Sequence, residues 1–392
     1  MKFTVNRLLM YQAVKTVLKA VRPSREIPEI GGILIEADAL RGVLTLTGTD
    51  VRTYIQRRLR QEHIEESGSI ILTPVLADML RLLAGEDVVF ESGAGNTVLL
   101  SSDKCRYSVP FLKDEKFPKM LIPFPEDTIQ IKGINSLIRR TVFAADSDNT
   151  DYSKAALSYV KLSFHGGMTT AQATDGRCMA ITASPHCADG NLELILHEKA
   201  LTILDGIVKP DEELYVGVVG KFAVFMKEDM FFSTMLFTGD YLEAGKVLEN
   251  FHQAYAATVD AKQLYELVST LSAIFGADDD KCVDLRIEAD RVCVQVKTAL
   301  SASSSHIPAA AVTPTPAEGF HYQARLLINC LRHLAGPVQI RIDQRGFVLM
   351  EANGSRYFIS PRGPVRIAKK EDKQEKKTQK VPKAKTTAAK AA

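Results

Sequence analysis

The fold is decided by a repeat, and its clearest copy reads Ala173-Thr174-Asp175-Gly176-Arg177-Cys178-Met179-Ala180. The Thr-Asp pair in this stretch also occurs 125 residues earlier, as Thr49-Asp50. A second pair, Arg106-Tyr107, returns 250 residues later as Arg356-Tyr357, which is twice the same period. A fixed period indicates one structural unit repeated along the chain. The sequence therefore predicts three units, at residues 1–125, 126–250 and 251–368.

Each unit shows the same order of strand and helix patterns. A short strand-like segment leads into an apolar-periodic helix near Leu8, Ile134 or Asp260, and a second helix follows about 70 residues later. Asp260 and Gln263 have the spacing of a capping box, which marks the start of that helix. Alternating strand patterns lie between the helices. The predicted class is α+β, with two helices packed on antiparallel sheets in each unit.

Composition limits the class of protein further. The 392 residues predict two or three domains, and 46% hydrophobic with 24% charged residues is ordinary for a globular chain. No apolar run approaches the roughly 18 residues of a membrane span. The start, Met1-Lys2-Phe3-Thr4-Val5, lacks the apolar core of a signal peptide, so we expect a cytoplasmic protein without a membrane partner. The six cysteines form no C-x-x-C spacing and are expected to be mostly buried small side chains.

The net charge of +2 hides an uneven distribution. Residues 369–392 carry +6, which leaves −4 on the body of the chain. This terminal segment has almost no large apolar residues and is predicted to be a disordered basic tail. It is either a solubilising extension or an electrostatic tether to nucleic acid. In the body, contact with nucleic acid would need a local basic surface.

Motifs of covalent chemistry do not occur in the sequence. There is no phosphate-binding G-x-x-x-x-G-K-S/T and no G-x-G-x-x-G after a strand, and His197-Glu198 lacks the second histidine of a zinc-protease motif. No nucleophile and base pair stands out. We therefore expect no catalytic residue, no metal site and no cofactor, in a protein that is not an enzyme.

The repeated unit resembles the bacterial DNA polymerase sliding clamp, the β subunit of the replicative polymerase, over essentially all of residues 1–368. Besides the start of the chain, the segments Leu46–Asp50, Phe117-Pro118 and Ala173–Ala180 carry the resemblance. The last is similar to the family's Ala-Thr-Asp-Gly-His-Arg-Leu-Ala. The resemblance implies a head-to-tail homodimer whose twelve helices line a hole around double-stranded DNA. It also implies a processivity function, in which the ring holds a DNA polymerase on its template.

Basic residues recur on the helices that the resemblance places around the hole. Lys15, Lys19 and Arg22 are spaced i, i+4 and i+7 and form one stripe. Arg139 and Arg140 are adjacent, so they cannot both point the same way. An ordinary solvated helix face is the alternative interpretation. The predicted sequence-independent DNA contacts are Lys15, Lys19, Arg22, Arg25, Arg139, Lys199 and Arg325.

The resemblance also implies an apolar pocket between the second and third units, where the polymerase and the clamp loader bind through short linear motifs. Core packing is the alternative for the apolar members. Arg177 stands where the family has histidine, which predicts a preference for more acidic peptides. The positions that match the family are Leu157, Thr174, Gly176, Val247 and Pro361, and Phe358 and Ile359 supply the apolar final strand. Met179 stands in place of the family's leucine, Leu242 in place of a proline and Lys246 in place of an arginine.

Ring closure is expected between the first and third units of two chains. The predicted contacts are Arg106, Tyr107 and Val109 on one side, with Ile274 and Phe275 on the other. The family's basic residues at the start of the second helix are replaced by Leu76 and Glu198, and its acidic strand by Ser301–His306. These departures indicate a divergent member. The alternative function is a clamp-fold scaffold or specialised paralogue that binds partners but is not loaded as a replicative clamp.

Overall fold

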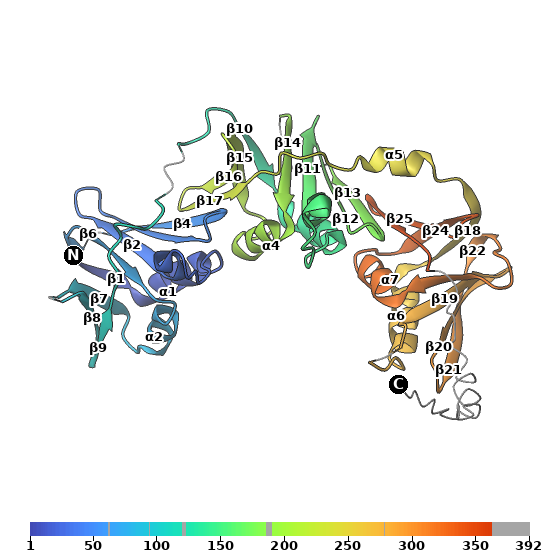
Figure 1. Cartoon of the computed structure of the whole chain (residues 1–392), viewed down its shortest axis with the longest axis horizontal. Helices are drawn as coiled ribbons and strands as arrows, with labels where there is room; N and C mark the ends of the chain where they lie inside the picture. The colour runs from blue at the N-terminus through green and yellow to red at the C-terminus, as the bar shows by residue number, and fades with distance from the viewer. Residues whose placement is uncertain (62, 94, 120–122, 186–189, 278, 363–392) are drawn as a thin grey trace, which may run out of the picture.

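The computed structural model describes residues 1–61, 63–93, 95–119, 123–185, 190–277 and 279–362. The predicted tail at 369–392 and Cys187 lie outside these ranges. The described chain forms an arch with its paired helices on the concave side and its sheets outside them, while the short helix α5 (Ala244–Glu249) lies on the outer side (Figure 1). The predicted α+β class, with antiparallel sheets, is confirmed.

The described residues of the first unit form nine strands, two α-helices and a short 3₁₀ turn at Pro28–Gly31. The Asn6 side chain caps α1 by accepting hydrogen bonds from the amides of Leu8 (3.0 Å) and Leu9 (3.2 Å). Its elements are β1 (Lys2–Asn6), α1 (Arg7–Val17), β2 (Ile33–Asp38), β3 (Val43–Thr49), β4 (Thr53–Arg60), β5 (Ile64–Glu66), β6 (Gly68–Leu72), α2 (Leu76–Leu82), β7 (Asp87–Ser92), β8 (Thr97–Ser102) and β9 (Cys105–Pro110).

The second unit repeats this order and adds 3₁₀ turns at Val142–Ala144 and Tyr152–Ser158. A short helix, α5 (Ala244–Glu249), lies in the segment that connects it to the third unit. Its elements are β10 (Thr128–Lys132), α3 (Ile134–Thr141), β11 (Tyr159–His165), β12 (Met168–Thr174), β13 (Cys178–Ser184), β14 (Leu192–His197), α4 (Glu198–Ile207), β15 (Glu213–Val219), β16 (Phe222–Lys227) and β17 (Met230–Met235).

The third unit starts its first helix where the capping pattern predicts. Asp260 accepts a hydrogen bond from the Gln263 amide at 2.9 Å, and α6 follows directly. The elements are β18 (Gln253–Asp260), α6 (Ala261–Ser272), β19 (Cys282–Ile287), β20 (Arg291–Lys297), β21 (Ala302–Pro308), β22 (Ala310–Thr313), β23 (Phe320–Gln323), α7 (Ala324–Leu331), β24 (Pro337–Asp343), β25 (Val348–Ala352) and β26 (Ser355–Ile359). The expected unit boundaries fall between β9 and β10 and between β17 and β18, and they stay a prediction.

The stretch around Asp175 forms a tight turn between β12 and β13. The Asp175 Oδ1 atom accepts hydrogen bonds from the amides of Arg177 (2.8 Å) and Cys178 (2.6 Å). The Thr174 hydroxyl donates to the Cys178 carbonyl at 2.8 Å. Gly176 has a φ of +82° within the turn. Glycine adopts this backbone without steric cost, because it has no Cβ atom.

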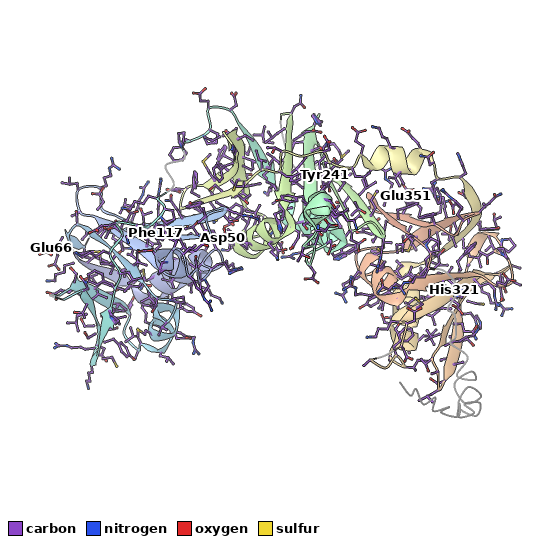
Figure 2. The ribbon with its side chains drawn as sticks, in the orientation of Figure 1. Asp50, Glu66, Phe117, Tyr241, His321 and Glu351 are labelled. Atoms are coloured by element: carbon purple, nitrogen blue, oxygen red, sulfur yellow. The ribbon has the colours of Figure 1, made fainter. Side chains whose placement is uncertain are left out.

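The other two units contain the same turn. Asp50 Oδ1 accepts a hydrogen bond from the Thr53 amide at 2.7 Å (Figure 2 labels Asp50 beside the second unit). In the third unit, the Thr298 hydroxyl replaces the carboxylate and accepts a hydrogen bond from the Ser301 amide at 3.0 Å. The three turns also share a backbone hydrogen bond, in which the amides of Asp50, Asp175 and Thr298 donate to the carbonyls of Thr53, Cys178 and Ser301, respectively. Thr53, Cys178 and Ser301 are therefore equivalent positions.

Edge strands of neighbouring units pair and join their sheets. The first junction pairs β17 with β4, and Thr234 lies opposite Thr53. The second junction pairs β26 with β13, and Ile359 lies opposite Cys178. The two registers coincide after a shift of 125 residues. The sheets have the orders β5-β1-β7-β8-β9, β10-β15-β16-β17-β4-β3-β2-β6, β14-β11-β12-β13-β26-β25-β24-β18-β22 and β21-β20-β19-β23.

Three of the cysteines follow the expectation of burial: Cys178, Cys282 and Cys330. Cys293 is half-buried. Cys105 is exposed, because it starts the edge strand β9.

Substitutions at the left-handed position of the first two turns should differ in their effect on stability. Gly176→Val should lower the free energy of unfolding by about 1–2 kcal/mol, since a left-handed backbone is strained for an L residue. A Cβ atom at this glycine would meet nothing within 4 Å, so the cost comes from the backbone alone. Val51 already has a φ of +75°, so Val51→Gly should raise stability or leave it unchanged. Thermal unfolding checks both, and a Gly176→Val protein as stable as the parent would contradict the account.

Candidate functional site

Three helix pairs form the concave side of the arch: α1 with α2, α3 with α4, and α6 with α7 (Figure 1). Each helix turns its apolar face to the sheets, as Met10, Val14 and Val17 of α1 show. The opposite faces remain accessible. The helices therefore present their polar residues to whatever the arch surrounds.

Five of the predicted DNA-contacting residues are exposed: Lys15, Arg22, Arg25, Lys199 and Arg325. Lys15 lies on α1, Lys199 on α4 and Arg325 on α7. None of the five forms an ion pair with another described residue. Their charges are therefore available to an anionic ligand.

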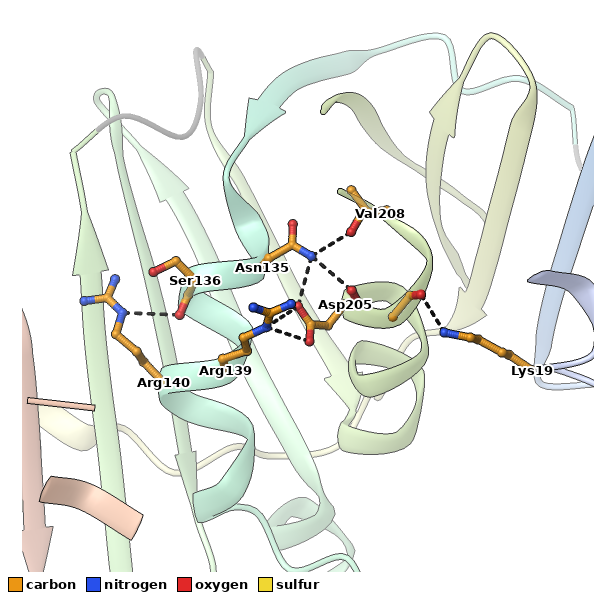
Figure 3. Close-up of polar contacts among 8 residues, drawn as sticks. Lys19, Asn135, Ser136, Arg139, Arg140, Asp205 and Val208 are labelled. Carbon is orange, nitrogen blue, oxygen red and sulfur yellow. Dashed lines mark hydrogen bonds and ion pairs between the residues drawn. The ribbon is translucent and has the colours of Figure 1, made fainter. Parts of the chain in front are cut away.

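The other two predicted DNA contacts, Lys19 and Arg139, bind within the chain (Figure 3). Lys19 Nζ donates to the Gly206 carbonyl at 2.5 Å, close to the end of α4. Partial burial and the charge of Lys15 lower the pKa of Lys19. Arg139 Nε lies 3.0 Å and 2.9 Å from the two carboxylate oxygens of Asp205. Lys19 thus connects the first unit to the second, and Arg139 connects α3 to α4.

The two adjacent arginines of α3 diverge, as their spacing requires (Figure 3). Arg139 points to α4, whereas Arg140 Nη1 donates to the Asn353 carbonyl (3.2 Å) and to Ser355 Oγ (3.1 Å) of the third unit. Arg140 Nε also donates to the Ser136 carbonyl at 3.2 Å. Arg140 therefore fixes the second junction on its helix side.

Sequence reasoning missed Asn135, which fixes the same layer (Figure 3). Its buried Nδ2 atom donates to the carbonyls of Asp205 (3.1 Å) and Val208 (2.9 Å). These carbonyls lie at the end of α4, where a helix leaves them without internal donors. The signal in the sequence is a lone amide between the apolar residues Ile134 and Leu137.

An apolar cluster lies at the second junction, where the peptide pocket is predicted. Met179 of β13 and Phe358 of β26 are both buried in it. Helix α5 adds Ala244 and Val247. The Phe358 ring stacks on Phe347 with centroids 5.2 Å apart. Three predicted pocket residues, Met179, Val247 and Phe358, thus come together, and exposed Leu242 lies just before α5.

The end of β26 meets the Asp175 turn beside this cluster. The Ser360 amide donates to the Arg177 carbonyl at 2.9 Å, which brings Pro361 next to the turn. The Arg177 side chain is exposed. Leu157 is half-buried, and its carbonyl accepts the Asp146 amide at 2.8 Å. A cationic side chain therefore lies at the edge of an apolar cluster.

Comparison with known proteins supports the resemblance. The family described as DNA polymerase III beta subunit, N-terminal domain, matches residues 1–121. A beta sliding clamp from Halalkalibacterium halodurans is 27% identical over 256 residues, which cover 62% of this chain and 66% of the relative. Over these matched parts, the chain is similar in sequence to the bacterial β sliding clamps.

Solved structures agree with this clamp fold. A DNA polymerase sliding clamp from Bacillus subtilis matches with a TM-score of 0.83 and 20% identity, over 93% of this chain and 100% of that one. The DNA polymerase III subunit beta from Pseudomonas aeruginosa matches with a TM-score of 0.82 and 18% identity, over the same shares. At this identity the likeness establishes the fold.

Some of the pocket residues carried over from the clamps lie elsewhere. Ile359 does not line the pocket: it is 0% exposed and packs in the main core, because neighbouring strand residues face opposite sides and Phe358 faces the cluster. Lys246 is exposed and pairs with Glu243 at 3.0 Å.

The predicted ring contacts are also revised in part. Val109 is buried in its own core, so only its backbone can serve an interface. Arg106 is exposed on the edge strand β9, and Tyr107 is half-buried. Ile274 is 36% exposed, whereas Phe275 packs against the core.

The second helices of the first two units start without the basic residues that the resemblance implies. Leu76 is buried, and so is Glu198, whose Oε1 atom has no hydrogen-bond partner among the described residues. Burial raises the pKa of Glu198. Because both side chains are buried, neither position offers an exposed positive charge to DNA.

No group of three or more His, Cys, Asp or Glu side chains among the described residues could hold a metal ion. None of the helices in the described part of the chain is long and apolar enough to span a membrane.

Proposed function

We propose that the chain is a DNA sliding clamp. In this function it is a non-catalytic ring that encircles duplex DNA, binds a DNA polymerase and gives it processivity. The observation that carries the proposal is the pair of strands at the two ends of the arch. β9 and β21 are the counterparts of the strands that join the units, yet within the described residues each pairs on one side only.

The repeat assigns each free edge a partner. β9 corresponds to β17 and β26, and β21 corresponds to β4 and β13, by their places in the sheets. A free strand edge is a template for pairing with another chain. A second copy supplies both missing partners at once, so two chains close head to tail. The association is heterologous, since a different edge of each chain takes part in each contact. A closed dimer is expected, because the second contact between the two chains completes the ring.

The equivalent turns predict which residues of β9 lie opposite which residues of β21 in the partner subunit. Ser301 is equivalent to Thr53 and Cys178, and Val109 is equivalent to Thr234 and Ile359. Val109 should therefore lie opposite Ser301 of the partner subunit. Two and four residues along, Tyr107 lies opposite Ser303 of the partner subunit, and Cys105 opposite Ser305 of the partner subunit.

Exposed apolar residues support the same closure. Leu82 at the end of α2 is 67% exposed, and Ile274 after α6 is 36% exposed. In the first junction the equivalent segments touch, since Lys19 after α1 binds Gly206 at the end of α4. Ile274 should therefore contact Leu82 of the partner subunit. Burial of two such side chains favours association.

The size of the hole requires two chains. Among the described elements six helices lie on the concave side, and a circle of six, each about 10 Å wide, would leave only about 9 Å clear. Twelve such helices leave about 28 Å. The major groove of a duplex alone is about 12 Å wide, so only the larger ring holds DNA.

The charges of the helix layer suit loose contact with phosphates. Lys15, Lys199 and Arg325 come from three different helices and are free of ion pairs to described residues. The body of the chain carries −4, so attraction to DNA is confined to this layer. Phosphate contacts of this kind carry no sequence information, which is what a sliding ring needs.

The cluster at the second junction is the proposed docking site for the polymerase and the clamp loader. Met179, Val247 and Phe358 offer an apolar surface, and exposed Arg177 adds a positive charge. A short linear motif binds such a surface through an apolar anchor, and a nearby acidic residue would pair with the arginine. The groove should therefore prefer acidic motifs.

A scaffold that binds partners without being loaded onto DNA is the second candidate. The observation in its favour is the lack of basic residues at Leu76 and Glu198. Ring closure and the peptide groove would serve both functions. The two differ in whether circular DNA retains the protein.

The predicted register can be tested by one engineered disulfide. Ser305→Cys should bond to Cys105 of the partner subunit under mild oxidation, because directly opposite strand residues have Cα atoms about 4.5–5.5 Å apart, within disulfide range. Non-reducing gel electrophoresis should show a covalent dimer. Ser304→Cys is the control, since its side chain points to the other sheet face. No dimer with Ser305→Cys, or equal amounts with both variants, would contradict the register.

The two kinds of basic residue should differ in their effect on DNA binding. Lys15→Ala should reduce the slope of log affinity against log salt by about 1 on a short linear duplex, because one phosphate contact is lost. Arg139→Ala should change the slope less, since its guanidinium is paired with Asp205. Fluorescence anisotropy across a salt series measures both slopes. Equal effects would contradict the assignment of Lys15 to the DNA-facing layer.

A further inference from the structure

A cavity of about 560 Å³ lies at the first junction, away from the groove proposed above. Its walls come from both units. The turn after β3 contributes Arg52, and the second unit contributes Asn149, Tyr159, His197, Met235 and Phe237. A volume of this size suits a ligand rather than a few waters.

The repeat identifies what this cavity corresponds to. The Met235 amide donates to the Arg52 carbonyl at 3.0 Å. The Ser360 amide donates to the Arg177 carbonyl at 2.9 Å, which is the same bond 125 residues later. Arg52 at the first junction is therefore equivalent to Arg177 at the second junction. The cavity is the counterpart of the cationic end of the proposed peptide groove.

One wall of the cavity is apolar. The rings of Tyr159 and Phe237 lie with centroids 4.5 Å apart. Met235 is 38% exposed beside them. A large apolar side chain entering the cavity would lose its contact with water against these three residues, which favours binding.

The opposite wall is positively charged. Arg52 is exposed and forms no ion pair with any residue the structure describes. Burial, together with the nearby charges of Lys199 and Arg52, lowers the pKa of His197, and the nearby Asp50 carboxylate acts in the opposite sense. The acidic residue in the lining, Asp151, already interacts with Lys154 at 3.7 Å. Among the residues that line the cavity, the charge left without an ion-pair partner is therefore that of Arg52.

We propose that this cavity is a second docking site, which binds a short acidic segment of a partner protein. The segment pairs one carboxylate with Arg52 and places a neighbouring apolar side chain against Tyr159, Phe237 and Met235. A nucleic-acid phosphate would use the arginine alone and leave the apolar wall uncovered. The choice of a protein partner rests on the proposed function. Each chain would then hold two partner segments, one at each junction.

Two methionines allow each site to be observed separately. Met235 reports on the cavity, and Met179 reports on the groove at the second junction. The dimer is labelled with ¹³C in its methionine methyl groups, and the two signals are assigned with Met→Leu variants. The probe is the acetylated and amidated tetrapeptide Asp-Leu-Phe-Gly, with Lys-Leu-Phe-Gly as its charge-reversed control.

The expected result is a saturable shift of the Met235 signal with the Asp peptide and a much smaller one with the Lys peptide. Arg52→Glu should weaken the Met235 response at least tenfold and leave the Met179 response unchanged. Arg177→Glu is the matched control and should do the reverse. Both residues are exposed, and in both the carbonyl makes the junction bond, so neither change removes that bond.

Three outcomes would overturn the inference: no Met235 shift, a shift that Arg52→Glu does not alter, or an equal shift with a thymidine hexanucleotide. A response of Met179 without one of Met235 would leave the proposed function standing. A response of Met235 without one of Met179 would instead contradict the groove of the proposed function and leave the cavity site in place.

Discussion

The structure depends on backbone hydrogen bonds between edge strands of successive units. β17 joins β4, and β26 joins β13, in the same register. An edge strand left open has unpaired amide and carbonyl groups, so pairing satisfies them and also sets the angle between the units. Because one face of each strand is buried, a slip by one residue would turn the core side chains outward. The junctions are therefore as specific as the core itself, and the arch follows from repeating them.

Because strand pairing closes the ring, the protein can retain DNA without binding it tightly. A ring that closes by strand pairing retains DNA by topology, so its inner surface needs only weak contacts. The helix layer is consistent with that. Arg139 and Arg140 form contacts that hold units and helices together, and only part of the basic set remains free. The buried Leu76 and Glu198 then remove little that a topological clamp requires.

The sequence predicted the repeat because its signal is local. The pairs Thr49-Asp50 and Thr174-Asp175 form the same side-chain to backbone bonds, and Asp260 caps its helix through a bond three residues away. Helices and hairpins follow from such short-range patterns.

The sequence alone could not predict which side chains meet in the folded protein. Phe358 and Ile359 are both apolar, and only the pairing of β26 with β13 decides which one faces the cluster. Lys19 lies on a basic stripe, but a carbonyl 187 residues away takes its ammonium. The cavity beside Arg52 is formed by two units and leaves no pattern in either one.

The central claim is that the protein holds DNA by encircling it. The most direct measurement loads the dimer onto nicked circular DNA with a clamp loader and raises the salt concentration, beside linear DNA of the same sequence. The account predicts that circular DNA keeps the protein at high salt, while linear DNA loses it over its ends. Equal and steeply salt-dependent loss from both would show ordinary electrostatic binding and would contradict the sliding-clamp function.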